Sequence, residues 1–195
     1  MDRIVWRASL AALVLAAATG TALRGMLHLG WPLPFELENV RHAHSHLMYF
    51  AWVTPALVLL IYRRLGLDPP TRILAVLLVL GFASYVPFLL TGYAFAQMGS
   101  MRLPISISIS TSALIAWYFA VAHYRRARRT SPNAFGRPFF DAAFALLVLA
   151  SLGAWGLGII QAIDPPNPVW FQTSLHLFLD GFAMGWLMLG VLGLA

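Results

Sequence analysis

Six long apolar runs decide what this chain can fold into. Each contains about 20 residues, which is enough to cross the roughly 30 Å hydrocarbon core of a bilayer as a helix. The runs lack the alternating pattern of barrel strands, and only helices and closed barrels satisfy their backbone in lipid. We therefore expect an all-α integral membrane protein, one domain (1–195) of six transmembrane helices. The runs cover residues 4–23, 41–62, 72–93, 103–124, 139–160 and 168–195.

The basic residues predict the orientation of these helices. All 13 are arginines, and ten of them lie at the N-terminus or in the connections after the second and fourth runs. Only Arg24, Arg41 and Arg102 lie on the other side. Because basic residues gather on the cytoplasmic side, both termini are predicted to be inside. We expect a bacterial inner-membrane protein whose partners are the lipid bilayer and either a second copy or a redox protein, and not nucleic acid.

Cysteine is missing from the sequence, although 60% of the residues are hydrophobic. Disulfides, thiolate metal sites and covalent attachment of a c-type haem are therefore excluded. Any metal must be held by histidine, methionine or carboxylate side chains. No nucleophile–base pair, phosphate loop or dinucleotide fingerprint is present, so the sequence assigns no catalytic residue.

Three of the six histidines fall within five residues at the start of the second run, at His42, His44 and His46. Ionisable side chains at this depth are costly and usually functional. In a helix His42 and His46 share a face and His44 points elsewhere, which suits one axial haem ligand. In an extended segment all three project to one side and form a site for copper or zinc. The sequence leaves both conformations open.

His176 in the last run is the expected partner of this cluster. It lies eight residues past Pro168, and His46 lies five past Arg41, on helices that run in the same direction. At 1.5 Å per residue the two histidines reach similar depths on the outer side. This arrangement is typical of a haem b with two histidine ligands.

Charged residues near these histidines suggest further roles. We expect Arg24, Arg41 and Arg102 to pair with haem propionates. Asp180, one turn beyond His176, is expected to accept its second ring N–H or to relay protons. We expect His123 to be an interfacial residue without a role in the site. His28 is a weak ligand candidate, and its position just outside the first run is more typical of a surface histidine. Gly181 and Gly185 predict a close helix contact.

Two segments resemble known membrane proteins. The segment His-Ser-His-Leu-Met-Tyr-Phe-Ala-Trp-Val (44–53) resembles the H-x-H-L-x-x-x-G-W-V helix of small proteins related to haem–copper oxidase catalytic subunits. It is also similar to the H-x-H-x-M-x-F helix of haem- and copper-containing membrane proteins linked to nitric oxide response. Residues 176–182 resemble the H-L-F-x-x-G-F helix of the small relatives.

The resemblance covers about 25 of the 195 residues, and Ala51 replaces the usual glycine. It implies ligands at His44, His46 and His176, a haem b, and copper as a further cofactor. The implied role is oxidoreductase-like, in electron transfer or in oxygen or nitric oxide handling. Six helices, against roughly twelve in a full catalytic subunit, favour a dimer or a haem-binding role.

Two other functions are compatible with the same residues. The first is copper or zinc binding or transport through His42, His44 and His46. The second is a transporter or proton channel without a cofactor, in which Asp180 and the histidines relay protons. A haem absorption spectrum distinguishes the haem-binding interpretation from both of these functions.

Overall fold

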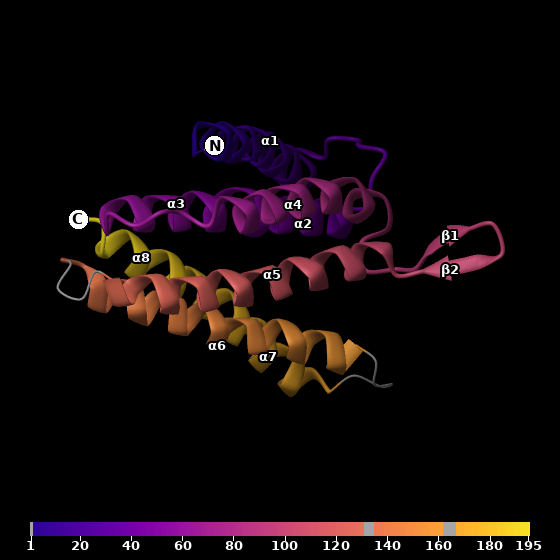
Figure 1. Ribbon diagram of the computed structural model, residues 1–195. Helices are drawn as coiled ribbons and strands as arrows, with labels where there is room; N and C mark the ends of the chain where they lie inside the picture. The colour runs from indigo at the N-terminus through magenta and orange to yellow at the C-terminus, as the bar shows by residue number, and fades with distance from the viewer. Residues whose placement is uncertain (1, 131–134, 162–166) are drawn as a thin grey trace. The chain divides into compact units, whose positions relative to one another are not determined.

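The computed structural model describes residues 2–130, 135–161 and 167–195. Within these residues, six helices are long and apolar enough to cross a membrane, as the sequence predicts (Figure 1). Single helices are α1 (Asp2–Leu29), α4 (Thr71–Thr91) and α6 (Arg137–Gln161). The other three are composite, and each changes its helical type along its length. They are α2 (Leu37–His46), η1 (Leu47–Val53) and α3 (Thr54–Arg64); α5 (Ile105–Ala127) and η2 (Arg128–Thr130); and α7 (Pro168–Asp180), η3 (Gly181–Leu187) and α8 (Met188–Leu192).

The helices group into two compact units, Met1–Leu59 with Pro69–Ala120 and Leu60–Asp68 with Val121–Ala195. In the first unit α1, α2, η1 and α4 pack against one another (Figure 1). The hydroxyls of Thr19 and Tyr85 lie 2.8 Å apart and join α1 to α4. Because a hydroxyl in an apolar environment needs a partner, this bond fixes the contact between these two helices.

A small hairpin that the sequence analysis did not predict separates α4 from α5. Strand β1 (Ala96–Met98) pairs antiparallel with β2 (Met101–Leu103) through a loop that begins at Gly99 with φ +62°. Leu103 pairs with Ala96, so α5 begins at Ile105 rather than at the predicted residue 103. Figure 1 shows the hairpin extending beyond the end of α5.

The second and sixth long helices, which carry the clustered histidines and His176, each contain a π-helical segment of seven residues. The first, η1, begins directly after His46 and ends one residue before Thr54-Pro55. Pro55 has no N–H to donate to the α-helical ladder, which favours an altered hydrogen-bond pattern in the preceding turns. Isolated π segments are frequent at functional sites.

The backbones of helix α4 and η1 come very close to each other where the two elements cross. A Cβ at Gly81 would lie 2.7 Å from the Cβ of Ala51 and 2.8 Å from its backbone nitrogen. The resemblance expects glycine at position 51, and this chain has alanine there with the glycine on the opposing helix. One missing side chain is sufficient for the close crossing, whichever helix lacks it.

In the second unit, α6 packs against α7 and η3 through small residues. A Cβ at Gly181 would lie 2.9 Å from the Cβ of Ala150, and one at Gly185 would lie 2.8 Å from that of Leu146. The predicted close contact at these two glycines is confirmed. At the start of α6, Asp141 accepts a 2.8 Å hydrogen bond from Tyr124. The same carboxylate pairs with nearby arginines, Arg128 and Arg137.

Candidate functional site

The backbone is helical through all three clustered histidines, because α2 runs from Leu37 to His46. The rings of His42 and His46 lie on one face with centroids 6.5 Å apart. His44 points to another helix, α1. The copper or zinc site made of three histidines requires an extended backbone. The backbone is helical instead, so that arrangement is not found. Among the described residues, no group of three or more His, Asp or Glu side chains is arranged to hold a metal.

His46 is buried and both of its ring nitrogens have partners. Nδ1 donates to the backbone carbonyl of His42 at 2.9 Å, so Nε2 accepts a hydrogen bond from the Tyr93 hydroxyl at 3.1 Å. The imidazole also stacks on Phe88, with ring centroids 3.8 Å apart. Burial raises the pKa of Tyr93, which keeps its hydroxyl protonated as the donor. To bind a metal through Nε2, His46 would have to lose its hydrogen bond with the Tyr93 hydroxyl.

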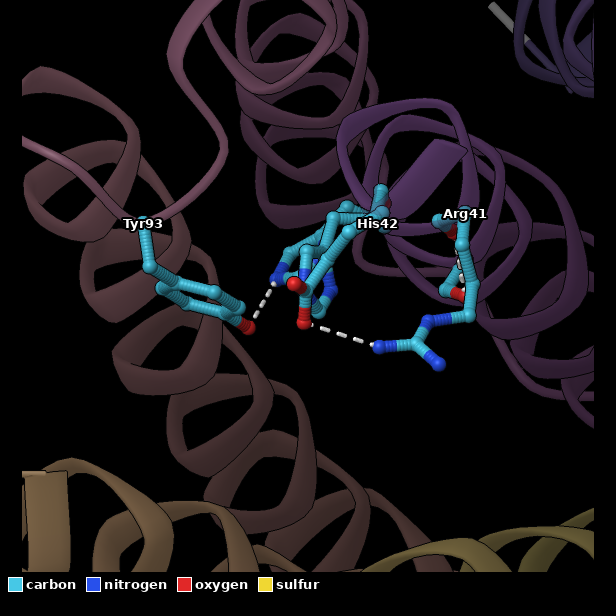
Figure 2. Close-up of polar contacts among 6 residues, drawn as sticks. Arg41, His42 and Tyr93 are labelled. Carbon is cyan, nitrogen blue, oxygen red and sulfur yellow. Dashed lines mark hydrogen bonds and ion pairs between the residues drawn. The ribbon is translucent and has the colours of Figure 1, made fainter. Parts of the chain in front are cut away.

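His42 and Arg41 share one acidic partner, Glu38, in the first turn of α2. The Glu38 carboxylate lies 3.4 Å from Nε2 of His42 and 2.9 Å from the Arg41 guanidinium. Figure 2 shows Tyr93 on one side of His42 and Arg41 on the other. Arg41 therefore already has a carboxylate partner, which it shares with His42.

His44 has one ring nitrogen in a hydrogen bond and one without a hydrogen bond to any residue that the structure describes. Its Nδ1 lies 2.9 Å from the carbonyl oxygen of Ala16, which can only accept a hydrogen bond. The ring proton is therefore on Nδ1 in this contact, and Nε2 is the nitrogen left for a ligand. A Cβ at Gly20 would lie 2.9 Å from Cε1 of His44, so the ring occupies space that only a glycine leaves open.

Beside His44 lies an open pocket of about 570 Å³ between α1 and α2. Its α1 residues recur every three or four positions and so form one face of that helix. The residues that line the pocket are Ala17, Gly20, Thr21, Leu23, Arg24, Leu27, His28 and His44.

Two cationic or ionisable side chains of α1, Arg24 and His28, lie in this pocket with His44. Both are exposed, and neither makes a side-chain hydrogen bond or ion pair with any residue that the structure describes. Arg102 lies over the Phe95 ring at 5.7 Å in the hairpin segment. The pairing of Arg24, Arg41 and Arg102 with haem propionates stays a prediction. From the sequence, His28 was only a weak candidate. Its spacing of four from Arg24 and eight from Gly20 was the available signal.

His176 and Asp180 form the predicted pair in the second unit. Nδ1 of His176 lies 3.3 Å from Oδ2 of Asp180, and the side chains are 67% and 71% exposed. His176 lies two residues from Ser174, which contacts α6, so the pair occupies the opposite face of α7. The ligation of a shared haem by His176 stays a prediction. His123, expected at the interface, lies 2.8 Å from the hydroxyl of the buried Tyr62.

The two histidine helices share a local design. In each helix the π segment begins five residues after a histidine, which is His42 in one helix and His176 in the other. The residue directly before the π segment is ionisable in both, His46 and Asp180 respectively. Each π segment also carries a tryptophan at its sixth position, Trp52 or Trp186.

Comparison with protein-family models, with curated proteins and with solved structures found no match for this chain. The part of the chain that the structure describes is helical, with six helices suited to a membrane. Its function is therefore inferred from its own residues and their geometry.

Proposed function

We propose that this protein binds haem b through His44 in the pocket between α1 and α2. The single observation that carries this proposal is the state of His44. A backbone carbonyl holds its Nδ1–H, and the side chain lines an open pocket. Metal-ligating histidines almost always donate their other ring N–H to such an acceptor, which fixes the tautomer and the ring orientation.

The remaining walls of the pocket fit a haem in chemical character. Its volume of about 570 Å³ falls within the range of cofactor and ligand sites, about 300–1,000 Å³. Leu23 and Leu27 supply apolar surface, and Arg24 supplies a cation that is not paired with any described residue. Guanidinium groups bind carboxylates strongly and with defined geometry, as haem propionates require.

The chain's own residues have distinct tasks in this proposal. His44 binds the iron, Gly20 leaves room for the His44 ring, and Arg24 orients the carboxylates. When bound, a haem supplies one-electron and diatomic-gas chemistry. We therefore propose a role in electron transfer or in oxygen or nitric oxide handling.

The site belongs to the outer side in this proposal. The ten-to-three distribution of arginines supports an orientation with both termini inside. Arg24 and the histidine cluster would then face the periplasm of a bacterial inner membrane. A redox protein on that side is the partner that this role requires.

An absorption spectrum tests the proposal directly. The full chain is expressed with ample haem, purified in detergent, and measured in the oxidised and reduced states. We expect a Soret band that His44→Ala abolishes and that His123→Gln, a histidine variant in the other unit, leaves intact. A colourless wild-type protein, or a Soret band that survives in His44→Ala, would overturn the proposal.

A further inference from the structure

We propose that the face of the sixth long helix that carries His176 and Asp180 binds the same face of a second copy of this chain within the membrane. The observation behind this proposal is the depth of an exposed carboxylate. The helix covers Pro168–Leu192, and Asp180 is the thirteenth of its 25 residues, at the middle of the span. The side chains of Asp180 and His176 are both exposed. The proposal does not depend on haem binding at His44.

An ionisable pair at the middle of a membrane helix needs a protein neighbour. Such residues are costly in lipid and almost always face other protein or a water-filled cavity. Helix α6 does not cover the pair, because Gly153 of α6 packs against Ser174 and Phe178, on the opposite face of α7. The neighbour of His176 and Asp180 therefore comes from outside the second unit.

The exposed face continues along the whole helix, from α7 through η3 into α8. Its residues recur every three or four positions, so they line up along one side. They extend over 20 residues, about 28 Å at 1.5 Å per residue, which is close to the thickness of the hydrocarbon core. The face is apolar at both ends and polar between them. Its residues are Val169, Gln172, Thr173, His176, Asp180, Met184 and Met188.

The pair of His176 and Asp180 is complementary to itself, which favours a second copy as the neighbour. With the imidazole protonated and the carboxylate ionised, the pair carries no net charge. Nδ1 of His176 lies 3.3 Å from Oδ2 of Asp180 in the same helix. This contact leaves Nε2–H as a donor and Oδ1 as an acceptor. A second copy offers the same donor and the same acceptor, as an interface between identical faces requires.

Two-fold symmetry brings these groups together. Two copies with the same orientation in the membrane are related by an axis along the membrane normal, so their sixth helices run parallel. His176 and Asp180 lie four residues apart, about 6 Å along the axis, and helical side chains tilt toward the N-terminus. The Asp180 side chain therefore leans toward the level of the other copy's imidazole. Each Nε2–H then donates to the carboxylate of the other copy, in two charge-assisted hydrogen bonds. In this arrangement Nε2 of His176 does not bind a haem.

Disulfide cross-linking tests the interface without changing the pair, and the chain has no cysteine of its own to interfere. Met184→Cys places one thiol on the proposed face, and Ala145→Cys places one at an exposed position of α6. Each position lies 16 residues from the end of its helix that is nearest the α6–α7 connection. A disulfide forms only when the two Cα atoms come within about 7 Å. The full-length variants are oxidised in native membranes and separated by mass.

We expect a linked dimer for Met184→Cys and only background for Ala145→Cys. Equal yields of dimer from the two variants would overturn the proposal. If the first unit or a water-filled path covers the pair instead, Met184→Cys gives no dimer, and this result also overturns it. A colourless protein that still forms the dimer leaves this proposal standing while haem binding fails.

A mixing experiment tests the pairing of charges across the interface. In the Met184→Cys background, His176→Asp gives a face with two carboxylates, and Asp180→Arg gives a face with two cationic side chains. Each variant alone should lose most of its cross-link. Two differently tagged copies, one of each variant, should recover the cross-link between unlike chains when they are expressed together. A role of the pair within its own helix would give no such recovery.

Two results of the mixing experiment would overturn the pairing. One is a cross-link that persists in each variant alone, and the other is its absence from the mixture. Asp180→Asn keeps the shape of the side chain and replaces any variant that fails to reach the membrane. It should weaken the cross-link of Met184→Cys, and an unchanged yield would overturn the pairing.

Discussion

The imidazole of His44 lies where a side chain at Gly20 would be, since a Cβ there would come 2.9 Å from Cε1 of His44. Gly20→Ala should therefore push His44 away from the Ala16 carbonyl. Losing that hydrogen bond removes about 0.5–1.5 kcal/mol, which corresponds to roughly 2- to 13-fold weaker haem binding. Titration of haem into the apoprotein, followed by the Soret band, measures this change.

A glycine in an open environment provides the control for Gly20→Ala. A Cβ at Gly158 meets nothing within 4 Å among the described residues. Gly158→Ala should leave haem affinity unchanged. Equal affinities for the two variants would show that the contact between positions 20 and 44 does not hold the ligand.

Tyr93→Phe should destabilise the first unit more than a similar change at Tyr85. Without the hydroxyl, the buried Nε2 of His46 loses its donor, and an unsatisfied buried group costs about 1–3 kcal/mol. Tyr85→Phe leaves Thr19 with its 2.8 Å bond to the Leu15 carbonyl, so the expected loss is only about 0.5–1.5 kcal/mol. The midpoints of thermal unfolding in detergent test the order, and the reverse order would contradict the role given to His46.

Stability should respond to alkaline pH through Tyr93. Burial raises the pKa of Tyr93 above its unfolded value, which is about 10 for a free tyrosine. The stabilisation from the protonated hydroxyl is therefore fully present below about pH 10 and is lost as the pH rises through the folded-state pKa. Unfolding midpoints measured from pH 7 to pH 11 should fall less above pH 10 in Tyr93→Phe than in the wild type. Identical slopes would show that this hydroxyl does not couple to folding.

Filling the crossing of α4 and η1 should destabilise the first unit, and moving the glycine should partly restore it. Gly81→Ala places a methyl group 2.7 Å from the Cβ of Ala51, and overpacking of this kind costs about 1–3 kcal/mol. Ala51→Gly removes that contact, but the backbone nitrogen at position 51 remains 2.8 Å away. The thermal unfolding midpoint of the double variant should lie between those of Gly81→Ala and the wild type. A double variant no more stable than Gly81→Ala would show that the two positions are not coupled.

The missing cysteines make the membrane orientation easy to test. Single cysteines at Ser100, in the hairpin loop, and at Asp68, in the connection before α4, both lie at exposed positions. A membrane-impermeant thiol reagent applied to intact cells should label Ser100→Cys and spare Asp68→Cys until the membrane is opened. The opposite labelling would reverse the proposed topology.

The helices could be predicted because each signal lies within one segment. Apolar runs give the six helices, and the helical period places His42 and His46 on one face without knowledge of their neighbours. The same reasoning places Asp180 one turn from His176, and the 3.3 Å contact confirms it. Such inferences need only the geometry of a single helix.

The rest of the site depends on contacts between helices. The Ala16 carbonyl that holds His44 has no sequence signature, since every residue has a carbonyl. Tyr93 could have been noticed as a partner of His46, because the start of one predicted helix and the end of the next lie at the same end of an antiparallel pair. The hairpin was missed because its strands have only three residues each, too short for an alternating pattern to show.

The π segment η1 sets the phase between the histidines and the rest of their helix. Its wider hydrogen-bonded turns hold about one residue more than the same length of α-helix. If these seven residues were wound as an α-helix instead, everything before them would turn by about 100°. His44 would then leave Gly20, and His46 would leave Tyr93, although no histidine had been changed. The direction in which the histidines face thus depends on the winding of an apolar stretch that contains none of them.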